Sequence, residues 1–269
     1  PVGSLLLLWP TYWAMWVAAE GVPSIANMVI FTLGVLLMRA AGCVINDIAD
    51  RKVDGHVKRT AQRPLATGAI RTKAAVIGFL VLCILAFLLV LNTNTLTIQL
   101  SVGGVILAFI YPFMKRHTHL PQVFLGAAFS WSIPMAFAAE SNSLPAAVWL
   151  LYAANLCWTV AYDTLYAMVD RDDDLVIGVK STAILFGAYD IFMIIVLQAL
   201  AIIALLLLAI QIDLGIVFYL ALLLGAVFLM VLNVSAKDRS RERCFRAFRL
   251  NHWFGAIVWL GFILNYALV

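Results

Sequence analysis

Apolar stretches of about twenty residues follow one another along almost the whole chain, separated by short polar breaks. A stretch of about twenty apolar residues is long enough to cross the hydrocarbon layer of a membrane as an α-helix. The stretches lack the alternation of a strand, and lipid does not tolerate open sheet edges, so helices are the spanning elements that fit. Counting between the breaks predicts about nine helices, centred near Trp9, Leu33, Leu82, Ile106, Phe129, Leu156, Ile202, Leu223 and Val258. The turn that is hardest to place is predicted at residues 211–215.

The composition supports this fold class. Hydrophobic residues make up 64% of the 269 positions and charged residues 12%, whereas a soluble domain carries roughly 25% charged residues. The sequence therefore predicts an all-α, multi-spanning membrane helical bundle that forms a single domain over residues 1–269. The chain begins at Pro1 inside an apolar stretch and without a methionine, so we expect a short N-terminal segment to precede it.

The 18 Lys and Arg residues occur only in every second connection. They are Arg39, Arg51, Lys52, Lys58, Arg59, Arg63, Arg71, Lys73, Lys115, Arg116, Arg171, Lys180, Lys237, Arg239, Arg241, Arg243, Arg246 and Arg249. Because cytoplasmic loops are enriched in Lys and Arg, the connections after helices two, four, six and eight are predicted to be cytoplasmic. The N-terminus is then inside and, with nine spans, the C-terminus outside.

More than half of the acidic residues fall in two short segments, each at the cytoplasmic end of a predicted helix. The first holds Asn46, Asp47, Asp50 and Asp54, and the second holds Asp163, Asp170, Asp172, Asp173 and Asp174. If the helices continue, residues 46, 50 and 54 share one helical face, and so do residues 163, 170 and 174. Asp47 points about 100° away and has a supporting part.

A solvated loop end is the simpler interpretation of any one such segment. However, like charges at this spacing repel, and carboxylates at a helix C-terminus oppose the helix dipole. Both penalties occur in both segments, which favours a bound cation. Carboxylates without a convergent His or thiolate suit a hard, oxygen-seeking ion, Mg²⁺ above all, and Mg²⁺ commonly completes its shell with substrate phosphates.

Basic residues lie beside the acidic segments. Lys58, Arg59 and Arg63 follow the first segment, and Lys115 and Arg116 lie one cytoplasmic loop further on. Some of them serve as topology signals and headgroup anchors. Arginine forks next to Mg²⁺ carboxylates are also what a diphosphate needs. A diphosphate held at the mouth of an apolar bundle implies a substrate whose lipid tail runs into the membrane.

These residues resemble the signatures of the UbiA superfamily of intramembrane prenyltransferases. The pattern NDxxDxxxD is met by Asn46, Asp47, Asp50 and Asp54, the pattern DxxxD by Asp170 and Asp174, and the pattern YxxxK by Tyr111 and Lys115. The three patterns stand in the expected helices and on the same predicted side, and together they are highly specific. Longer stretches within the first 190 residues resemble the bacterial members that use 4-hydroxybenzoate as acceptor.

The resemblance implies an activity in ubiquinone biosynthesis, at the bacterial inner membrane. A polyprenyl group passes from a polyprenyl diphosphate to the ring carbon ortho to the hydroxyl of 4-hydroxybenzoate, with Mg²⁺ as cofactor. Asp50, Asp54, Asp170 and Asp174 would hold Mg²⁺ through the diphosphate, assisted by Asn46 and Asp163. The other implied substrate-binding residues are Arg59, Arg63, Tyr111 and Lys115, with Arg116 for the benzoate carboxylate. Its partners are then these substrates and membrane lipids, with no nucleic acid.

Three alternatives are weighed against this reading. A prenyltransferase of the same family could use a menaquinone, haem or tocopherol-pathway acceptor. An ion-coupled transporter usually places ionisable residues near the bilayer midplane, and we expect none at the centre of a span here. A CDP-alcohol phosphotransferase would carry DGxxAR, but Asp54 and Gly55 are followed by HVKR.

Overall fold

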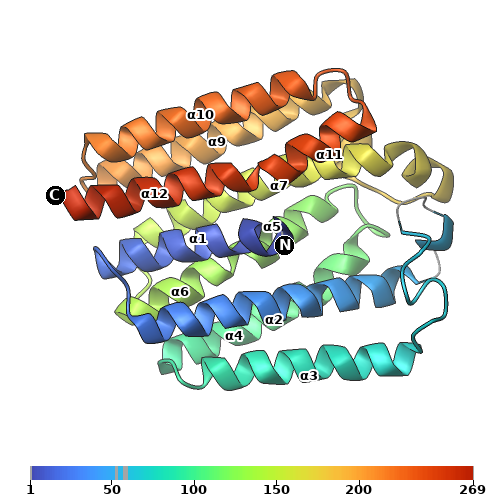
Figure 1. The fold of residues 1–269 in the computed structure, drawn as a ribbon, viewed down its shortest axis with the longest axis horizontal. Helices are drawn as coiled ribbons and strands as arrows, with labels where there is room; N and C mark the ends of the chain where they lie inside the picture. Colours follow the sequence, from blue (N-terminus) through green and yellow to red (C-terminus); the bar gives the residue numbers. More distant parts are fainter. Residues whose placement is uncertain (1, 52–53, 57–59, 269) are drawn as a thin grey trace.

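The chain folds as a bundle of helices that run roughly parallel and antiparallel to one another (Figure 1). The computed structural model describes residues 2–51, 54–56 and 60–268, and within these ranges every regular element is helical. The helices are α1 (Val2–Ala19), α2 (Ile25–Asp50), η1 (Asp54–His56), α3 (Thr72–Val90), α4 (Thr95–Met114), α5 (Pro121–Ser130), α6 (Ser132–Ser141), α7 (Ala146–Ile177), α8 (Thr182–Phe186), η2 (Gly187–Tyr189), α9 (Asp190–Gln211), α10 (Ile216–Ser235), α11 (Arg241–Leu250) and α12 (His252–Leu268).

The predicted spans all correspond to helices of the structure. Within the described ranges, eight helices are long and apolar enough to cross a membrane, where α5 with α6, α8 with α9, and α11 with α12 each count as one. The ninth predicted span is α7, which has 32 residues. The predicted turn at residues 211–215 is confirmed, because α9 ends at Gln211 and α10 begins at Ile216. The chain is therefore a multi-pass helical membrane protein, as its sequence predicts.

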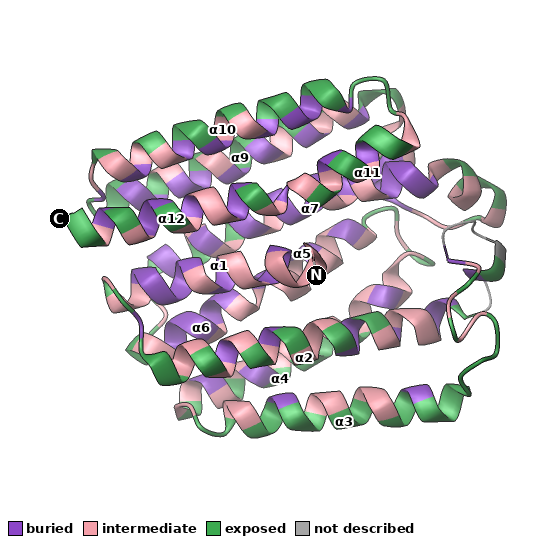
Figure 2. Cartoon of the chain, viewed as in Figure 1, coloured by how far each residue is buried: buried purple, intermediate pink, exposed green. Residues whose placement is uncertain are grey.

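Helix α7 is less apolar than the other eight predicted spans, and many of its residues are buried inside the bundle (Figure 2). It packs against α9, α5 and α11, and its buried residues include Asn155, Thr159 and Thr164. The Asn155 amide donates to Ser130 Oγ at 2.9 Å, and the hydroxyls of Thr164 and Thr182 lie 2.7 Å apart. A helix enclosed by protein can carry polar side chains that find partners on its neighbours, whereas a lipid-facing helix cannot.

Stacked indole rings join α1, α7 and α12 at the centre of the bundle. Trp13 and Trp158 are fully buried and their ring centroids lie 5.6 Å apart. Trp13 Nε1 donates to the Gly255 carbonyl at 2.9 Å, and Trp158 Nε1 donates to Asn251 Oδ1 at 3.1 Å. A Cβ at position 255 would meet Trp9 at 2.7 Å and Trp158 at 2.8 Å, so only glycine permits this close approach.

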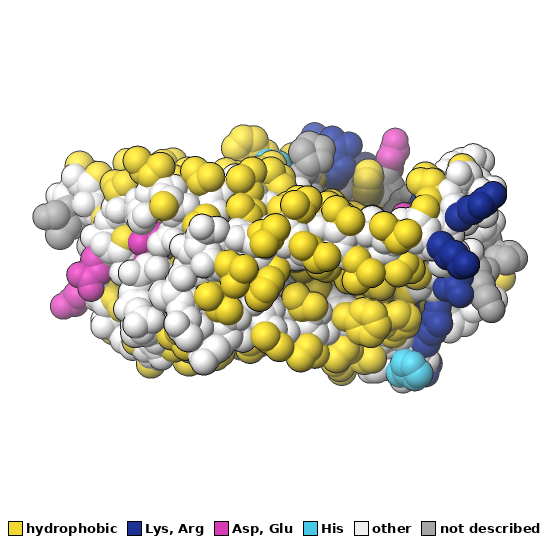
Figure 3. Space-filling model, turned by 90° about the horizontal axis from the view of Figure 1, so that it is seen from below, with side chains coloured by type: hydrophobic (Ala, Val, Ile, Leu, Met, Phe, Trp, Pro, Cys, Tyr) yellow, Lys and Arg dark blue, Asp and Glu magenta, His cyan; other side chains and the backbone are white. Residues whose placement is uncertain are grey.

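The connections separate by charge into the two ends of the bundle. Among the described residues, 51, 54–56, 60–71, 115–120, 178–181 and 236–240 lie at one end, drawn at the right of Figure 1, and the Lys- and Arg-free connections lie at the other. Figure 3 shows one side of the molecule, with Lys and Arg gathered at that same end and a broad apolar surface beside them. Connections with and without Lys and Arg, which alternate along the sequence, therefore lie at opposite ends of the bundle.

One basic segment is more ordered than the sequence suggests. The Lys and Arg residues between α10 and α12 are predicted to form a connection, yet residues 241–250 form the helix α11. Its buried residues, Cys244 and Ala247, are three apart and face the bundle, whereas Arg243 faces away from it. Three- and four-residue spacing of this kind is the pattern of an amphipathic helix, which the count of charges alone overlooks.

Candidate active site

A cavity of about 680 Å³ opens at the charged end of the bundle and brings the two acidic segments together. Side chains of α1, α2, α4, α5, α7 and α11 line it. Of the residues predicted to form the site, those that line the cavity are Asn46, Asp50, Asp54, Arg63, Tyr111, Lys115, Asp163, Asp170 and Asp174. Arg59 lies outside the described residues. Segments more than a hundred residues apart in sequence therefore share one chamber.

The first acidic segment does not form one continuous helix. The expectation that residues 46, 50 and 54 share a helical face is wrong, because α2 ends at Asp50 and Asp54 begins the short helix η1. The Arg51 guanidinium donates to the Ile48 carbonyl at 2.7 Å and so satisfies one of the last carbonyls of α2. Ending the helix here avoids a further carboxylate stacked at its C-terminus, where repulsion and the helix dipole both oppose it.

Asp54 nevertheless lines the cavity, and Thr60 and Arg63 hold it there. The Thr60 hydroxyl donates to the Asp54 carbonyl at 3.0 Å. Arg63 Nη1 lies 3.1 Å from Asp54 Oδ2 and 2.8 Å from Asp47 Oδ1, so one guanidinium joins the helical and the non-helical parts of the segment. Asp47 also lines the cavity, although its position in the sequence predicts that it points about 100° away from Asn46 and Asp50.

Asp50 is the most enclosed carboxylate of the segment, with 3% of the residue exposed. Lys115, at the end of α4, forms an ion pair with Asp50 Oδ2. The second oxygen, Oδ1, is buried and has no hydrogen-bond partner in the part of the chain that the structure describes. A buried charged oxygen without a partner is costly, and a bound cation is the natural partner of a carboxylate in a cavity lined by further carboxylates.

The second acidic segment is a continuous helix, as predicted, because α7 extends beyond Asp174 to Ile177. Asp163, Asp170 and Asp174 all line the cavity. Residues 171–173, between Asp170 and Asp174, point away from the cavity. Arg171 pairs with the fully buried Asp190 at the start of α9. Asp172 and Asp173 each lie 3.2 Å from Arg241 of α11. The helical period thus divides the segment into a cavity-facing side and a side that anchors α9 and α11.

Asp190 fixes the rotation of α7 at this point. Besides Arg171, it binds Arg239, whose Nε lies 2.9 Å from Asp190 Oδ1 and 3.1 Å from Oδ2. Arg239 in turn donates to the Ala188 carbonyl at 2.8 Å. A buried carboxylate held by two guanidinium groups ties the connection before α11 to the end of α7 that carries Asp170 and Asp174.

The donor set fits Mg²⁺ bound together with phosphate oxygens, and does not form an all-protein cage. Among the described residues, no three His, Cys, Asp or Glu side chains stand close enough to hold a metal ion by themselves. Mg²⁺ usually takes one or two carboxylates and fills its shell with water and substrate phosphates. Two carboxylate segments on different sides of one chamber, with the unpartnered Asp50 Oδ1, suit that mode of binding.

Arg39 is a site residue that sequence reasoning assigned only to topology. It lies within α2, eleven residues before Asp50, and not in a connection. Its guanidinium carbon lies over the Phe129 ring, 5.8 Å from the ring centroid, and the guanidinium packs against Gly3. An arginine inside an apolar span usually faces a functional cavity, and this rule could have identified it.

Arg116, the residue expected to bind a benzoate carboxylate, does not line the cavity. Its guanidinium donates to the Ala49 carbonyl near the end of α2 and lies 6.0 Å from the Phe113 ring. Other cations do line the cavity, namely Lys180 and Arg249. The geometry therefore favours Arg39 over Arg116 as the group that meets a small anionic substrate.

A membrane bundle with carboxylates and cations around a chamber at one end is typical of enzymes that act on phosphorylated lipids. The sequence profile of the UbiA prenyltransferase family matches residues 7–255, and the chain belongs to this family. It is 59% identical to the 4-hydroxybenzoate octaprenyltransferase of Marinobacter nauticus, over 99% of this chain and 91% of the relative. It is 60% identical to the enzyme of that name from Pseudomonas fluorescens, over 100% of this chain and 90% of the relative.

Solved structures share the fold. The apo structure of a UbiA homologue from Aeropyrum pernix superposes with a TM-score of 0.85 at 24% identity and covers 98% of both chains. A UbiA homologue from Archaeoglobus fulgidus bound to GPP and Mg²⁺ gives a TM-score of 0.71 at 18% identity, over 96% of both chains. At these identities the likeness concerns the arrangement of the helices, and the UbiA fold predicted from the sequence motifs is confirmed.

Proposed function

We propose that this protein transfers a polyprenyl group from a polyprenyl diphosphate to 4-hydroxybenzoate. The allylic C–O bond breaks and its electron pair leaves with the diphosphate. The ring carbon ortho to the phenol attacks the allylic cation, a C–C bond forms, and that carbon loses its proton. The relatives that match over nearly the whole chain are octaprenyltransferases by name, so the donor proposed here carries eight isoprene units.

The observation that carries the proposal is the shared chamber. Both acidic segments and two cations, Arg63 and Lys115, line one cavity at the end of an apolar bundle. A diphosphate needs the charged groups, and a hydrocarbon chain needs the apolar interior behind them. The high identity to 4-hydroxybenzoate octaprenyltransferases supports the same conclusion from an independent side.

The charged residues have separate tasks in this proposal. Asp50, Asp54, Asp170 and Asp174 would hold Mg²⁺ through the diphosphate, with Asn46 and Asp163 beside them. Bound Mg²⁺ would neutralise charge that develops on the leaving oxygens. Arg63, Lys115 and Arg59 add to this neutralisation, and Tyr111 forms the wall of the chamber. Stabilising charge as it develops is the largest single contribution that such sites make to catalysis.

Arg39 is the proposed partner of the acceptor carboxylate. It is the cavity-lining cation furthest into the membrane, about 16 Å along α2 from Asp50 at 1.5 Å per residue. A benzoate held there points its phenol ring toward the diphosphate end, between Phe129 and the aspartates. Arg116 is the alternative and faces the carbonyl of Ala49 instead.

The orientation in the membrane follows from the charge distribution. We place the end that carries the cavity and the Lys and Arg residues in the cytoplasm, and the C-terminus of α12 outside. For a bacterial protein the membrane is then the inner one, and phosphatase and fluorescent-protein fusions at residues 142 and 238 measure this orientation directly.

Purified protein in lipid vesicles, supplied with octaprenyl diphosphate and 4-hydroxybenzoate, tests the activity. We expect prenylated 4-hydroxybenzoate by mass spectrometry with Mg²⁺, and none after EDTA. Competing acceptors in the same tube, 1,4-dihydroxy-2-naphthoate and homogentisate, test the menaquinone and tocopherol alternatives. Exclusive prenylation of one of those would overturn the acceptor assignment, and turnover that survives EDTA would overturn the metal assignment.

A further inference from the structure

The end of α7 is held by ion pairs on the sides that do not face the cavity. At about 100° per residue, residues 171–173 point in three directions around the helix, and Asp174 returns to within about 40° of Asp170. The first of these three residues pairs with Asp190 of α9, and the other two pair with Arg241 of α11. The ion pairs therefore decide the direction in which Asp170 and Asp174 face the cavity that they line.

Of the two anchors, Asp190 is the firm one. The side chains of Arg241 and Asp172 are 41% and 80% exposed, and exposed ion pairs contribute little. Asp190 is fully buried, and the side chain of Arg171 is 20% exposed. A change in the rotation of α7 therefore has to break the contact of Arg171 with Asp190.

The backbone at Arg239 is strained in a way that completes the contacts of Asp190. Arg239 has a φ of +58°, in the left-handed region that residues other than glycine rarely adopt. Its Nε donates to both carboxylate oxygens of Asp190, at 2.9 and 3.1 Å. Strained backbone of this kind persists where the surrounding contacts over-determine it, and it is common near functional sites.

The helices do not depend on this cluster to stay together. Helices α7 and α9 share the most extensive helix–helix contact among the described elements. The hydroxyls of Thr164 and Thr182 also join α7 to the segment that precedes α9. A buried ion pair can often be replaced by apolar residues without loss of stability, and its best-attested use is to specify one arrangement. We therefore look for the role of Asp190 in the orientation of α7.

A small rotation of α7 is enough to disturb the site. The Cα atoms of a helix lie about 2.3 Å from its axis, and an aspartate carboxyl carbon lies roughly 4 Å from it. A rotation of about 15° therefore displaces the Asp170 and Asp174 carboxylates by about 1 Å. A misplacement of about 1 Å can lower the rate of an enzyme about a hundredfold.

We propose that Asp190 is a positioning residue for the Mg²⁺–diphosphate site, and that it acts through Arg171 on Asp170 and Asp174. The inference rests on the proposed prenyl transfer and adds a residue that does not itself line the cavity. Loss of the Asp190 charge then weakens the binding of Mg²⁺ and diphosphate by more than a loss of folded protein explains.

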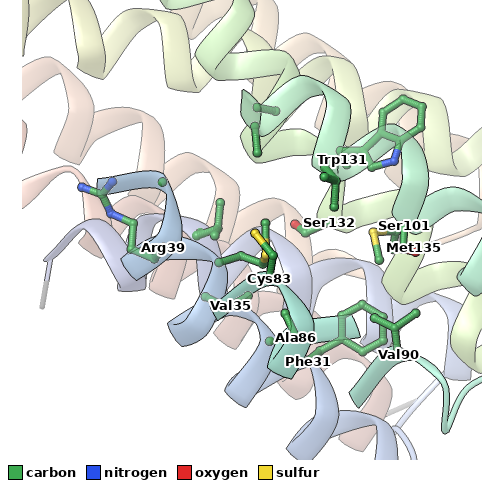
Figure 4. A pocket seen from close by; sticks show the side chains of 18 of the residues that line it. Phe31, Val35, Arg39, Cys83, Ala86, Val90, Ser101, Trp131, Ser132 and Met135 are labelled. Atoms are coloured by element: carbon green, nitrogen blue, oxygen red, sulfur yellow. The ribbon is translucent and has the colours of Figure 1, made fainter. Parts of the chain in front are cut away.

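The effect is confined to the charged cavity. An apolar pocket of about 150 Å³ adjoins it and shares Arg39 as a lining residue. Figure 4 shows this pocket, with Phe31, Val35 and Ala86 around it. Its described lining residues lie between positions 7 and 135, before α7 begins. A rotation of the end of α7 therefore changes the charged cavity and leaves the apolar pocket as it is.

Binding of inorganic diphosphate with Mg²⁺ tests the proposal without turnover. Isothermal titration calorimetry on the protein in lipid nanodiscs measures the Kd, which we expect to rise about tenfold or more in Asp190→Asn. Asn233→Leu is the matched control, because Asn233 is buried and its Nδ2 donates to Gln198 Oε1 of α9 at 2.6 Å. Neither residue of this pair lines the cavity. The control lowers Tm through the loss of a buried partner and leaves the Kd unchanged.

Arg171→Met is the second variant, and it keeps the proposal testable if Asp190→Asn does not fold. Asp190 retains Arg239 as its partner in this variant. We expect the same rise in Kd, together with a tenfold higher Mg²⁺ concentration at half-maximal rate and an unchanged KM for 4-hydroxybenzoate. A purely structural loss lowers the amount of active protein and leaves these constants as they are.

Two results separate the inference from the function on which it rests. An unchanged Kd in folded Asp190→Asn or in Arg171→Met would overturn the positioning role. An unsubstituted protein that binds Mg²⁺ and diphosphate but transfers no prenyl group would overturn the proposed function instead.

Discussion

Replacing Lys115 by methionine tests whether a cation of the protein occupies the place of the metal. In the structure Lys115 pairs with Asp50, whose other oxygen has no hydrogen-bond partner among the described residues. Methionine keeps much of the side-chain length and removes the charge, so the variant leaves a buried carboxylate without its ion-pair partner. Mg²⁺ alone then becomes a far better partner for Asp50 than it is in the unsubstituted protein.

The magnitude follows from the burial of the pair. Removing one partner of a fully buried ion pair costs roughly 3–5 kcal/mol. The Lys115 side chain is 20% exposed and the pair borders a cavity, so we expect a loss of about 2 kcal/mol, between the values for buried and surface pairs. For a chain of this size that corresponds to a fall in Tm of about 4–8 °C.

Thermal unfolding of the purified protein, with and without MgCl₂, measures both effects. Mg²⁺ at a hundred times its Kd stabilises by about 2.7 kcal/mol if it binds only the folded state. We expect Lys115→Met to regain its lost Tm in Mg²⁺, and the unsubstituted protein to respond less. Lys180→Met is the matched control, because Lys180 lines the same cavity and approaches the His117 carbonyl instead of a carboxylate.

A double-mutant cycle with Asp50→Asn isolates the pair. If the destabilisation arises from an unpaired carboxylate, Lys115→Met costs little in the Asp50→Asn background, since neighbouring residues in one ion pair are not additive. An equal loss of Tm in both backgrounds, or a loss that Mg²⁺ does not reverse, would refute the exchange of Lys115 for a metal ion.

Three further outcomes are expected. Asp170→Asn removes one of the cavity-facing carboxylates and should lower kcat about a hundredfold or more while Tm changes little, as loss of a group that stabilises transition-state charge does, and steady-state kinetics with saturating Mg²⁺ measure this. Asp190→Asn should lower the free energy of unfolding by about 3–5 kcal/mol, because Arg171 and Arg239 lose a fully buried partner. Asp172, whose side chain is 80% exposed, is the control, and Asp172→Asn should cost less than about 1 kcal/mol. Thermal unfolding measures both variants. Arg39→Gln should raise KM for 4-hydroxybenzoate and leave KM for the donor unchanged, and the opposite split, or the same split in Arg116→Gln, would contradict the carboxylate assignment.

The sequence predicts the spans well, and also which connections share one end of the bundle, because lipid imposes simple rules. Hydrocarbon demands long apolar helices, and the translocation machinery sorts Lys and Arg, so both signals are local in sequence. The spacing of Asp163, Asp170 and Asp174 also predicts their common face, because α7 is an unbroken helix there.

The end of α2 and the place of Arg39 were not predicted from the sequence, and both have the same physical cause, namely contacts with distant parts of the chain. Whether α2 continues to Asp54 depends on groups that arrive from elsewhere, namely Thr60 and Arg63, which hold the residue after the helix has ended. Arg39 looked like the start of a basic connection, because the apolar stretch in front of it is already long enough to span. Its position is set by Gly3 and Phe129, which no local pattern of α2 reveals.

The position of α7 has a consequence for how the protein is made. Insertion into the bilayer is decided largely helix by helix as the chain emerges, and polar residues near a helix centre oppose it. Helix α7 carries Asn155, Thr159 and Asp163, and it is the one predicted span that falls short of the apolarity of the other eight across the described chain. Asn155 has its partner, Ser130, on α5, which is already synthesised, but the element that α7 packs against most extensively is α9, which follows it. The helix that carries the second acidic segment is thus fully stabilised only when α9 has been synthesised, which makes biogenesis of the membrane domain cooperative across its two halves.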